Sequence, residues 1–226
     1  MTLSQPQMSK NTPGTSCLLT IIIPAYNEEK RLPRSLPLIM DFAAHQDYEV
    51  EVIVVDDGSE DRTASVVREF QQQYPSLRLF QVEHGGKGHA VRAGMLRARG
   101  EYLFLCDSDL SMPVDEMARF LPPELEDYDV AIGSREVTGA RRFDEPEYRH
   151  IMGRVFNGLV SLLLVSGIKD TQAGFKCFRR EAAQWLFNQQ TIKGWAFDVE
   201  ILFRRSGAAC ALSKYPSTGI TRTTAV

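Results

Sequence analysis

The chain has 226 residues, of which 43% are hydrophobic and 24% charged, and its formal net charge is −3. This length and balance fit one large α/β domain with its own core, and they exclude the strongly basic surface that nucleic-acid-binding domains usually carry. We therefore expect one soluble globular domain with no nucleic-acid partner. Any other anionic partner must be met by a local group of charges.

The cysteines give no sign of a metal cluster or of a disulfide framework. Cys17, Cys106, Cys177 and Cys210 lie far apart in the sequence. They form no C-x-x-C pair and no cluster with histidine, so neither a structural zinc site nor paired disulfides are expected. Reduced thiols in a cytoplasmic protein are the simplest interpretation.

The ends and the apolar runs bear on membrane contact. Residues 1–16 are polar and lack the apolar core of a signal peptide, which predicts a disordered tail. No run reaches the roughly 18 apolar residues that a bilayer-spanning helix needs. Residues 151–165 are apolar with basic residues at their start, and they fit either a buried core helix or a helix in the headgroup layer. The second interpretation predicts peripheral contact with the cytoplasmic face of a membrane.

Strands and helices are predicted to alternate along the chain. Continuous apolar and β-branched runs predict the strands, and helical patterns lie between them. The predicted strands are residues 18–23, 51–55, 77–82, 102–106 and 128–132, and the predicted helices are residues 33–44, 61–73, 88–99 and 113–121. Such alternation predicts right-handed βαβ crossovers and an α/β fold, with a mostly parallel central sheet flanked by helices.

The unusual residues follow directly on the predicted strands. They are residues 24–28, 56–59, 84–89 and 107–111. Because such sheets bind ligands at the carboxyl ends of their strands, we expect these segments to form one site. Residues 136–149, after the fifth strand, are charged and too long for a plain connection, which favours a mobile loop at the active site.

Two carboxylates, Asp107 and Asp109, come straight after the strand at residues 102–106. Ionised Asp is rarely buried unless it is paired or binds a metal, so a divalent cation is the simplest partner. A turn in which Asp caps the next element is the alternative. An EF-hand is excluded, because Met112 stands where Gly is needed and Ala118 where a bidentate Glu is needed.

The glycine-rich segment at residues 85–88 predicts an anion site. It opens a predicted helix, where free backbone N–H groups, the helix dipole and Lys87 would attract a phosphate. A solvated glycine turn is the alternative. The spacing does not fit a P-loop, and residues 24–28 read Pro-Ala-Tyr-Asn-Glu where a dinucleotide-binding fold needs G-x-G-x-x-G. These two classes of nucleotide enzyme are therefore excluded.

The motifs occur in one fixed order. They are Pro-Ala-Tyr-Asn-Glu at 24–28, Asp-Asp-Gly-Ser at 56–59, Gly-Lys-Gly at 86–88, Asp-Ser-Asp at 107–109 and Gly-Ser-Arg at 133–135. The set resembles the inverting nucleotide-sugar glycosyltransferases of family 2, which have a GT-A fold. Segments 170–176 and 194–200 resemble the polyprenyl-phosphate branch of that family, and most of all the dolichyl-phosphate β-glucosyltransferases. The resemblance implies a catalytic domain at residues 17–205 and a divergent tail at residues 206–226.

The resemblance also implies a donor, which we expect to be UDP-glucose, and a cation. Pro24, Tyr26, Glu28 and Asp56 would bind the base and ribose, and Lys87 would contact the diphosphate. The pair Asp107 and Asp109 would hold Mg²⁺ or Mn²⁺ between the two phosphates, with Asp109 as the direct ligand.

The acceptor that the resemblance implies is dolichyl phosphate or another polyprenyl phosphate. Arg135 would bind its phosphate, and Gln172, Lys176 and Asp198 would shape the sugar and acceptor end of the cleft. Asp109, Arg135 and Asp198 are the candidate catalytic residues. A phosphate monoester is largely ionised at pH 7, so it can attack without a general base.

Two other functions stay open at this point. A related transferase with a hydroxyl acceptor, on a glycan or a small molecule, would use Asp198 or Glu200 as its base. A non-catalytic module that binds a nucleotide sugar is the other alternative, because residues 206–226 do not match the usual end of the family. The oligomeric state and the choice between UDP and GDP are also open.

Overall fold

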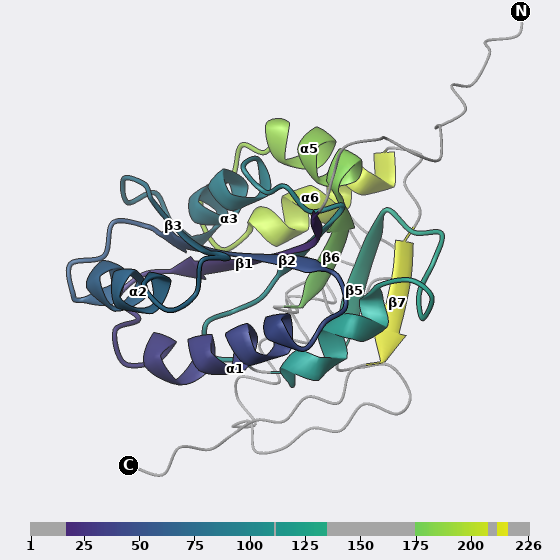
Figure 1. Cartoon of the computed structure of the whole chain (residues 1–226). Helices are drawn as coiled ribbons and strands as arrows, with labels where there is room; N and C mark the ends of the chain where they lie inside the picture. Colours follow the sequence, from purple (N-terminus) through teal and green to yellow (C-terminus); the bar gives the residue numbers. More distant parts are fainter. Residues whose placement is uncertain (1–16, 111, 135–174, 208–211, 217–226) are drawn as a thin grey trace, which may run out of the picture.

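The computed structural model describes residues 17–110, 112–134, 175–207 and 212–216, and it places them around a single sheet (Figure 1). The strands are β1 (Cys17–Ala25), β2 (Glu49–Asp56), β3 (Leu77–Gln81), β4 (Tyr102–Leu105), β5 (Val130–Ser134), β6 (Lys176–Arg179) and β7 (Leu212–Pro216). The helices are α1 (Leu32–Ala44), α2 (Thr63–Gln71), α3 (Lys87–Met95), the 3₁₀ helix η1 (Val114–Phe120), α5 (Arg180–Asn188) and α6 (Phe197–Gly207).

The sheet has the strand order β3-β2-β1-β4-β6-β5-β7 in the described part of the chain. The pairs β3-β2, β2-β1 and β1-β4 are parallel, whereas β6 runs antiparallel to both β4 and β5. The strand β7 pairs in parallel with β5. The predicted α/β fold with a mostly parallel sheet is therefore confirmed.

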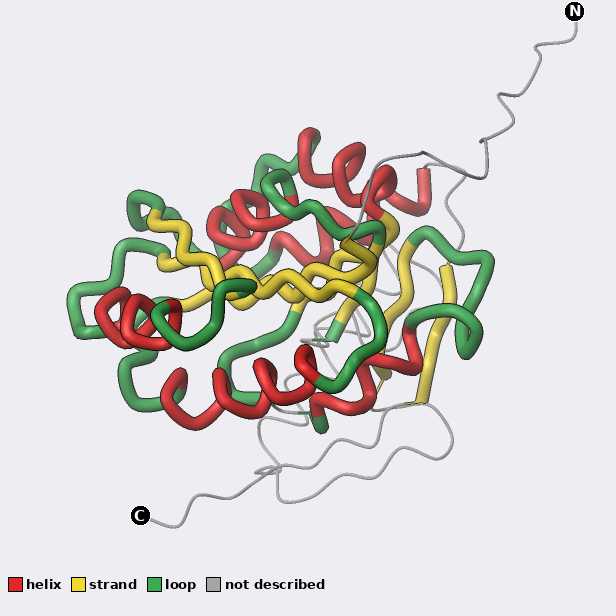
Figure 2. The backbone as a smooth tube through the Cα atoms, viewed as in Figure 1, coloured by secondary structure: helices red, strands yellow, loops and turns green. Residues whose placement is uncertain are grey.

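Helices cover both faces of the sheet (Figure 2). One apolar cluster packs residues of α1, α2 and η1 against one face, and a second packs residues of α3, α5 and α6 against the other. The alternation of side chains along β1 shows the division, because Ile21 and Ile23 belong to the first cluster and Ile22 to the second. A strand buried on both faces needs a continuous apolar run, which is why β1 and β2 could be predicted from the sequence.

Several elements differ from the expectation. Residues 113–121 were predicted as an α-helix but contain the 3₁₀ helix η1. The strand β6 and the helix α5 were not predicted. The expected domain end at residue 205 falls inside α6, and β7 extends the sheet from the segment that we expected to be a tail. The division into domains stays a prediction.

Some predictions fall outside the described residues. These are the tail at 1–16, Arg135, the loop at 136–149, the apolar stretch at 151–165 and Gln172. Among the helices that the structure does describe, none combines the length and the apolar character needed to cross a bilayer.

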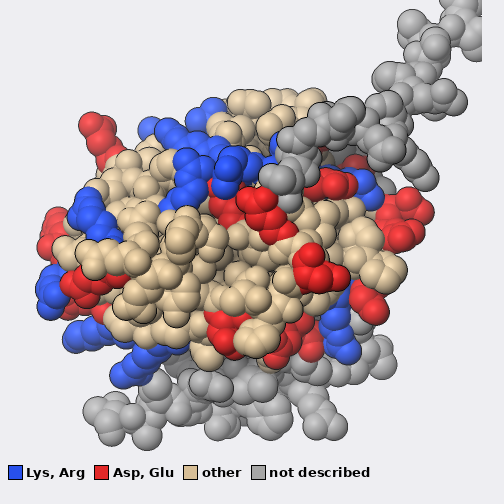
Figure 3. Space-filling view, in the orientation of Figure 1, with Lys and Arg blue, Asp and Glu red and all other residues tan. Residues whose placement is uncertain are grey.

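The surface charges are of mixed sign. On the face drawn in Figure 3, Lys and Arg side chains lie beside Asp and Glu side chains at several places. The exposed ion pairs include Arg31 with Glu28, Arg62 with Glu69 and Arg119 with Glu116. Pairs of this kind contribute little to stability, since water screens both partners.

A buried carboxylate on β2 ties four segments together. The Glu51 side chain is 0% exposed and accepts hydrogen bonds from Thr20 Oγ1 at 2.9 Å, Arg78 at 2.8 Å, and the backbone N–H and Nε of Arg99 at 3.0 and 2.9 Å. Burial alone would raise the pKa of this carboxyl, but the hydrogen bonds outweigh burial and hold the pKa below its ordinary value of 4.5. Glu51 therefore stabilises the fold as an anion.

We predict that Glu51→Gln lowers the free energy of unfolding by about 3 kcal/mol at pH 7, because a neutral amide loses the charge-assisted hydrogen bonds from Arg78 and Arg99. A lowered folded-state pKa stabilises the protein above the unfolded value, and this contribution is lost as the pH falls through the folded value. The wild-type advantage over the variant should therefore shrink below pH 4.5. Urea unfolding followed by circular dichroism measures both effects. Glu49→Gln, at an exposed position of the same strand, is the control and should change little.

Candidate functional site

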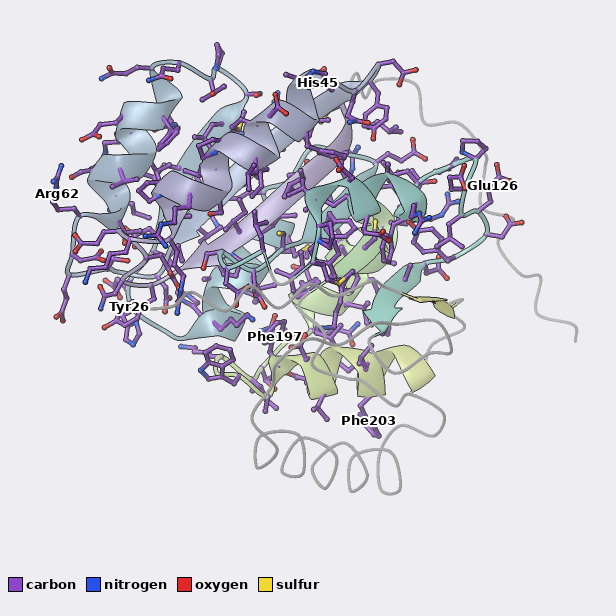
Figure 4. All side chains as sticks on the ribbon, turned by 90° about the horizontal axis from the view of Figure 1, so that it is seen from below. Tyr26, His45, Arg62, Glu126, Phe197 and Phe203 are labelled. Carbon is purple, nitrogen blue, oxygen red and sulfur yellow. The ribbon has the colours of Figure 1, made fainter. Side chains whose placement is uncertain are left out.

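Many of the predicted donor residues line one pocket. Its volume is about 320 Å³, and it opens where β1, β4 and the start of α3 meet. Six of its lining residues were predicted from the sequence: Pro24, Tyr26, Glu28, Lys87, Asp107 and Asp109. In Figure 4, Tyr26 and Phe197 lie in the lower half of the view and His45, at the far end of α1, lies at the top.

The parallel pairing of β1 with β4 brings two of these segments together. Ile22 on β1 faces Leu105 on β4, and the N–H of Cys106 donates to the carbonyl of Ile22 at 3.0 Å. Both strands therefore end at the same edge of the sheet, and Tyr26 and Asp107, which follow them, line the same pocket. The site lies at the carboxyl edge, as the strand order requires.

The carboxylate of Asp57 holds the glycine-rich loop that precedes α3. It accepts the backbone N–H of Gly85 at 3.0 Å and of Gly86 at 2.8 Å. Its oxygens also lie 3.0 Å from His84 Nδ1 and 3.4 Å from His89 Nδ1. Gly86 has a φ of +95°, a backbone conformation that suits glycine alone. Asp57 and Gly86 together set the turn from which α3 begins.

Lys87 occupies the first turn of α3 and faces the carboxylates after β4. Its Nζ lies 2.6 Å from Asp107 Oδ1 and 4.8 Å from the centre of the Trp195 ring. A Lys ammonium group at a helix N-terminus adds to the positive electrostatic potential there, since the free backbone N–H groups are also partly positive. The arrangement can bind an anion such as a phosphate group.

A second ion pair lies deeper in the protein. Lys176 Nζ is 2.8 Å from Asp198 Oδ1, and the two side chains are 2% and 9% exposed. Burial raises the pKa of Asp198, while the ammonium groups of Lys176 and Lys87 act in the opposite direction. The carboxylate of Asp107 adds to the increase, so Asp198 lies within electrostatic reach of the pocket. Neither Lys176 nor Asp198 is among the described residues that line the pocket.

Asp56, which we expected to bind the base and ribose, does not line the pocket, whereas its neighbour Asp57 does. Asp56 is fully buried, and its carboxylate accepts the N–H of Ser59 at 2.9 Å and Nε2 of Gln81 at 3.0 Å. Asp57 lines the pocket instead. Successive side chains point to opposite sides of an extended chain, so the sequence motif alone cannot say which of the two aspartates faces the ligand.

Other residues with functional side chains also line the pocket, but the sequence did not identify them as site residues. They are Arg31, Asp57, His84 and Trp195. The rings of His84 and Tyr26 lie 4.4 Å apart. Both His84 and Trp195 belong to segments that the sequence did single out, residues 84–89 and 194–200.

The oxygen ligands that the pocket offers suit a hard divalent cation. Asp107 and Asp109 both line the pocket, and carboxylate oxygens are the ligands that Mg²⁺ and Mn²⁺ prefer. Among the described residues no group of three or more His, Cys, Asp and Glu side chains could hold a metal ion. Asp107 and Asp109 would supply only part of the coordination of such a cation, so its remaining ligands would have to come from elsewhere.

We predict that Asp57→Asn frees the turn before α3. Hydrogen bonds to a charged acceptor are worth about 1.5–3 kcal/mol, so the amides of Gly85 and Gly86 should exchange with solvent about tenfold faster or more. Hydrogen exchange followed by NMR measures the rates. Asp61→Asn removes a carboxylate that accepts the N–H of Glu29 and Thr63, and it should leave both glycines unchanged. Equal protection in the two variants would contradict the role of Asp57.

Solved structures share the fold. A glucosyl-3-phosphoglycerate synthase from Mycobacterium tuberculosis, in complex with UDP, superposes with a TM-score of 0.65 and 19% identity, over 93% of this chain and 73% of that chain. A mannosyltransferase from Pyrobaculum calidifontis, in complex with GDP-Man and Mn²⁺, gives a TM-score of 0.52 and 21% identity, over 94% and 58%. At such identities the likeness concerns the fold, which is the GT-A fold of glycosyltransferases.

Dolichyl-phosphate beta-glucosyltransferases of other organisms are similar to this chain in sequence. The dolichyl-phosphate beta-glucosyltransferase of Drosophila melanogaster is 39% identical over 204 residues, which cover 82% of this chain and 61% of the relative. The human protein of that name is 36% identical over 200 residues, covering 82% and 62%. The chain thus spans about three fifths of the length of these relatives. Residues 20–187 match glycosyl transferase family 2, and the chain belongs to that family.

Proposed function

We propose that the chain forms the catalytic part of an inverting enzyme that transfers glucose from UDP-glucose to dolichyl phosphate or another polyprenyl phosphate. The observation that carries this proposal is the pocket itself, which gathers Tyr26, Lys87, Asp107 and Asp109 from three separate segments. The relatives named dolichyl-phosphate beta-glucosyltransferase support the choice of sugar and acceptor.

The lining of the pocket supplies the kinds of group that such a donor needs. Tyr26 and His84 offer aromatic faces for the base, and Glu28 offers a carboxylate for polar contacts. Lys87 lines the same pocket and would contact the diphosphate. The synthase crystallised with UDP has the same fold, so this fold can hold a uridine nucleotide, as it holds GDP-Man in the mannosyltransferase.

Departure of the nucleoside diphosphate requires that its growing negative charge be neutralised. Lys87 places an ammonium group at the N-terminus of α3, where helix dipole and side chain act on the same phosphate. A divalent cation held by Asp107 and Asp109 would, when bound, supply further charge neutralisation at the leaving group. No proton has to be transferred to the diphosphate for it to leave.

The nucleophile is an acceptor phosphate that is already ionised at neutral pH. Asp198, the base that a hydroxyl acceptor would need, is buried and held in an ion pair with Lys176. This pairing favours the phosphate acceptor over the hydroxyl acceptor. Arg135, which we expect to bind the acceptor phosphate, and Gln172 lie outside the described residues, so their roles stay predictions, as does contact with a membrane.

Transfer of labelled glucose from UDP-glucose to a short polyprenyl phosphate tests the function directly. We expect product with Mg²⁺ or Mn²⁺, none in excess EDTA, and a loss of about 10²-fold or more in the rate of Asp109→Asn. Asp115→Asn, on an exposed position of η1, is the matched control and should transfer normally. Preference for a hydroxyl acceptor, or binding of donor without any transfer, would instead support one of the two alternatives.

Lys87 should discriminate between nucleotide and nucleoside. We predict that Lys87→Ala weakens the binding of UDP about tenfold or more, because a charge-assisted contact is lost, and leaves the binding of uridine unchanged. Calorimetry with both ligands measures the difference. Lys30→Ala, at an exposed lysine that does not line this pocket, is the control. Equal losses for UDP and uridine would show that Lys87 acts on the loop and not on the phosphates.

A further inference from the structure

Trp195 lines the pocket although its side chain is largely open to solvent. It is 73% exposed, and its ring lies under the Lys87 ammonium, with Nζ 4.8 Å from the ring centre. A tryptophan in contact with solvent gives up much of the stabilisation that burial would supply. Its position therefore needs a reason other than packing of the core.

The loop that carries Trp195 is fixed at its base by Glu200 of α6. This carboxylate accepts the backbone N–H of Thr191 at 3.0 Å, the hydroxyl of Thr191 at 2.8 Å and the N–H of Ile192 at 2.7 Å. Arg204, one turn further along α6, donates to the same carboxylate at 2.8 Å. Glu200 therefore joins the loop before α6 to α6 itself.

The same loop is also bound to the N-terminal turn of α3. The N–H of His89 donates to the carbonyl of Lys193 at 2.9 Å, and Gln190 Nε2 donates to the carbonyl of Gly88 at 2.9 Å. The approach is so close that a Cβ on Gly88 would lie 2.8 Å from the carbonyl oxygen of Lys193. The turn that presents Lys87 and the loop that presents Trp195 thus form one unit.

We propose that Trp195 is a substrate-contacting residue that packs against the sugar of the donor, and that Glu200 is the residue that positions its loop. The inference rests on the proposed function, because it assumes a nucleotide-sugar donor in this pocket. Trp195 stands beside Lys87, which the proposed function assigns to the diphosphate, and the rings of Tyr26 and His84 form a separate aromatic pair in the same pocket. The C–H groups of a hexose present an apolar face that an indole ring can cover.

The experiment compares a ligand with the sugar and one without it. Trp195→Ala should weaken binding of UDP-glucose by about two- to tenfold, the size of an aromatic packing contact, and should leave binding of UDP within twofold of wild type. Trp185→Ala, at an exposed position of α5 outside the pocket, is the matched control and should change neither. Calorimetry on the full chain measures all affinities.

Fluorescence gives a second, independent measurement. The chain has two tryptophans, so in Trp185→Phe all tryptophan fluorescence comes from Trp195. UDP-glucose should shield Trp195 from iodide quenching, and UDP should shield it much less. When Glu200→Gln is added to Trp185→Phe, iodide should quench Trp195 more strongly in the absence of ligand. The binding of UDP-glucose should weaken more than the binding of UDP. Glu181→Gln, exposed on α5, should do neither.

The outcomes separate this inference from the proposed function. If the wild type transfers glucose while Trp195→Ala binds UDP-glucose as well as the wild type does, the inference is wrong and the function stands. If lipid vesicles shift the emission of Trp195 and the donor does not, the ring faces a membrane surface and the inference is wrong. A wild-type protein that binds neither UDP nor UDP-glucose would overturn both.

Discussion

The parallel pairing of β1 with β2 on one side and β4 on the other is the constraint on which the site depends. It makes three strands end at one edge, and the segment that follows each strand contributes a functional group: Tyr26 after β1, Asp57 after β2 and Asp107 after β4. No one of these segments could form the pocket alone. The apolar strands that fill the core therefore also set the distances among the polar groups above them.

Charges at this edge are arranged as linked pairs. Lys87 lies against Asp107, Lys176 lies against Asp198, and the pKa of Asp198 responds to both Lys87 and Asp107. The two pairs form one electrostatic system that extends from the pocket into the core. Interactions in such a region are stronger than in water, so a change in the charge of Lys87 or Asp107 alters the energy of the ionised form of Asp198.

Much of the sheet could be predicted, because strands buried on both faces need continuous apolar runs. The strand β6 could not, since its four residues include Lys176, paired with Asp198, and Arg179, which donates to the carbonyl of Tyr128 at 2.8 Å. Charged residues that are satisfied only in the folded protein hide a strand in the sequence. The segments on the donor side of the site could be located in the sequence because they directly follow strands that continuous apolar runs predict. Asp57 was missed because the choice between neighbouring aspartates depends on the local direction of the chain.

Lys87 connects these features to the chemistry. Its ammonium is paired with Asp107 and lies over the ring of Trp195. A diphosphate that binds at the start of α3 competes with Asp107 for the same ammonium, and a cation that binds with it competes with Lys87 for Asp107. Under the proposed function, donor and cation would therefore replace the Lys87–Asp107 ion pair together. Binding of either one would release a partner for the other, which would couple the binding of the nucleotide to that of its cation.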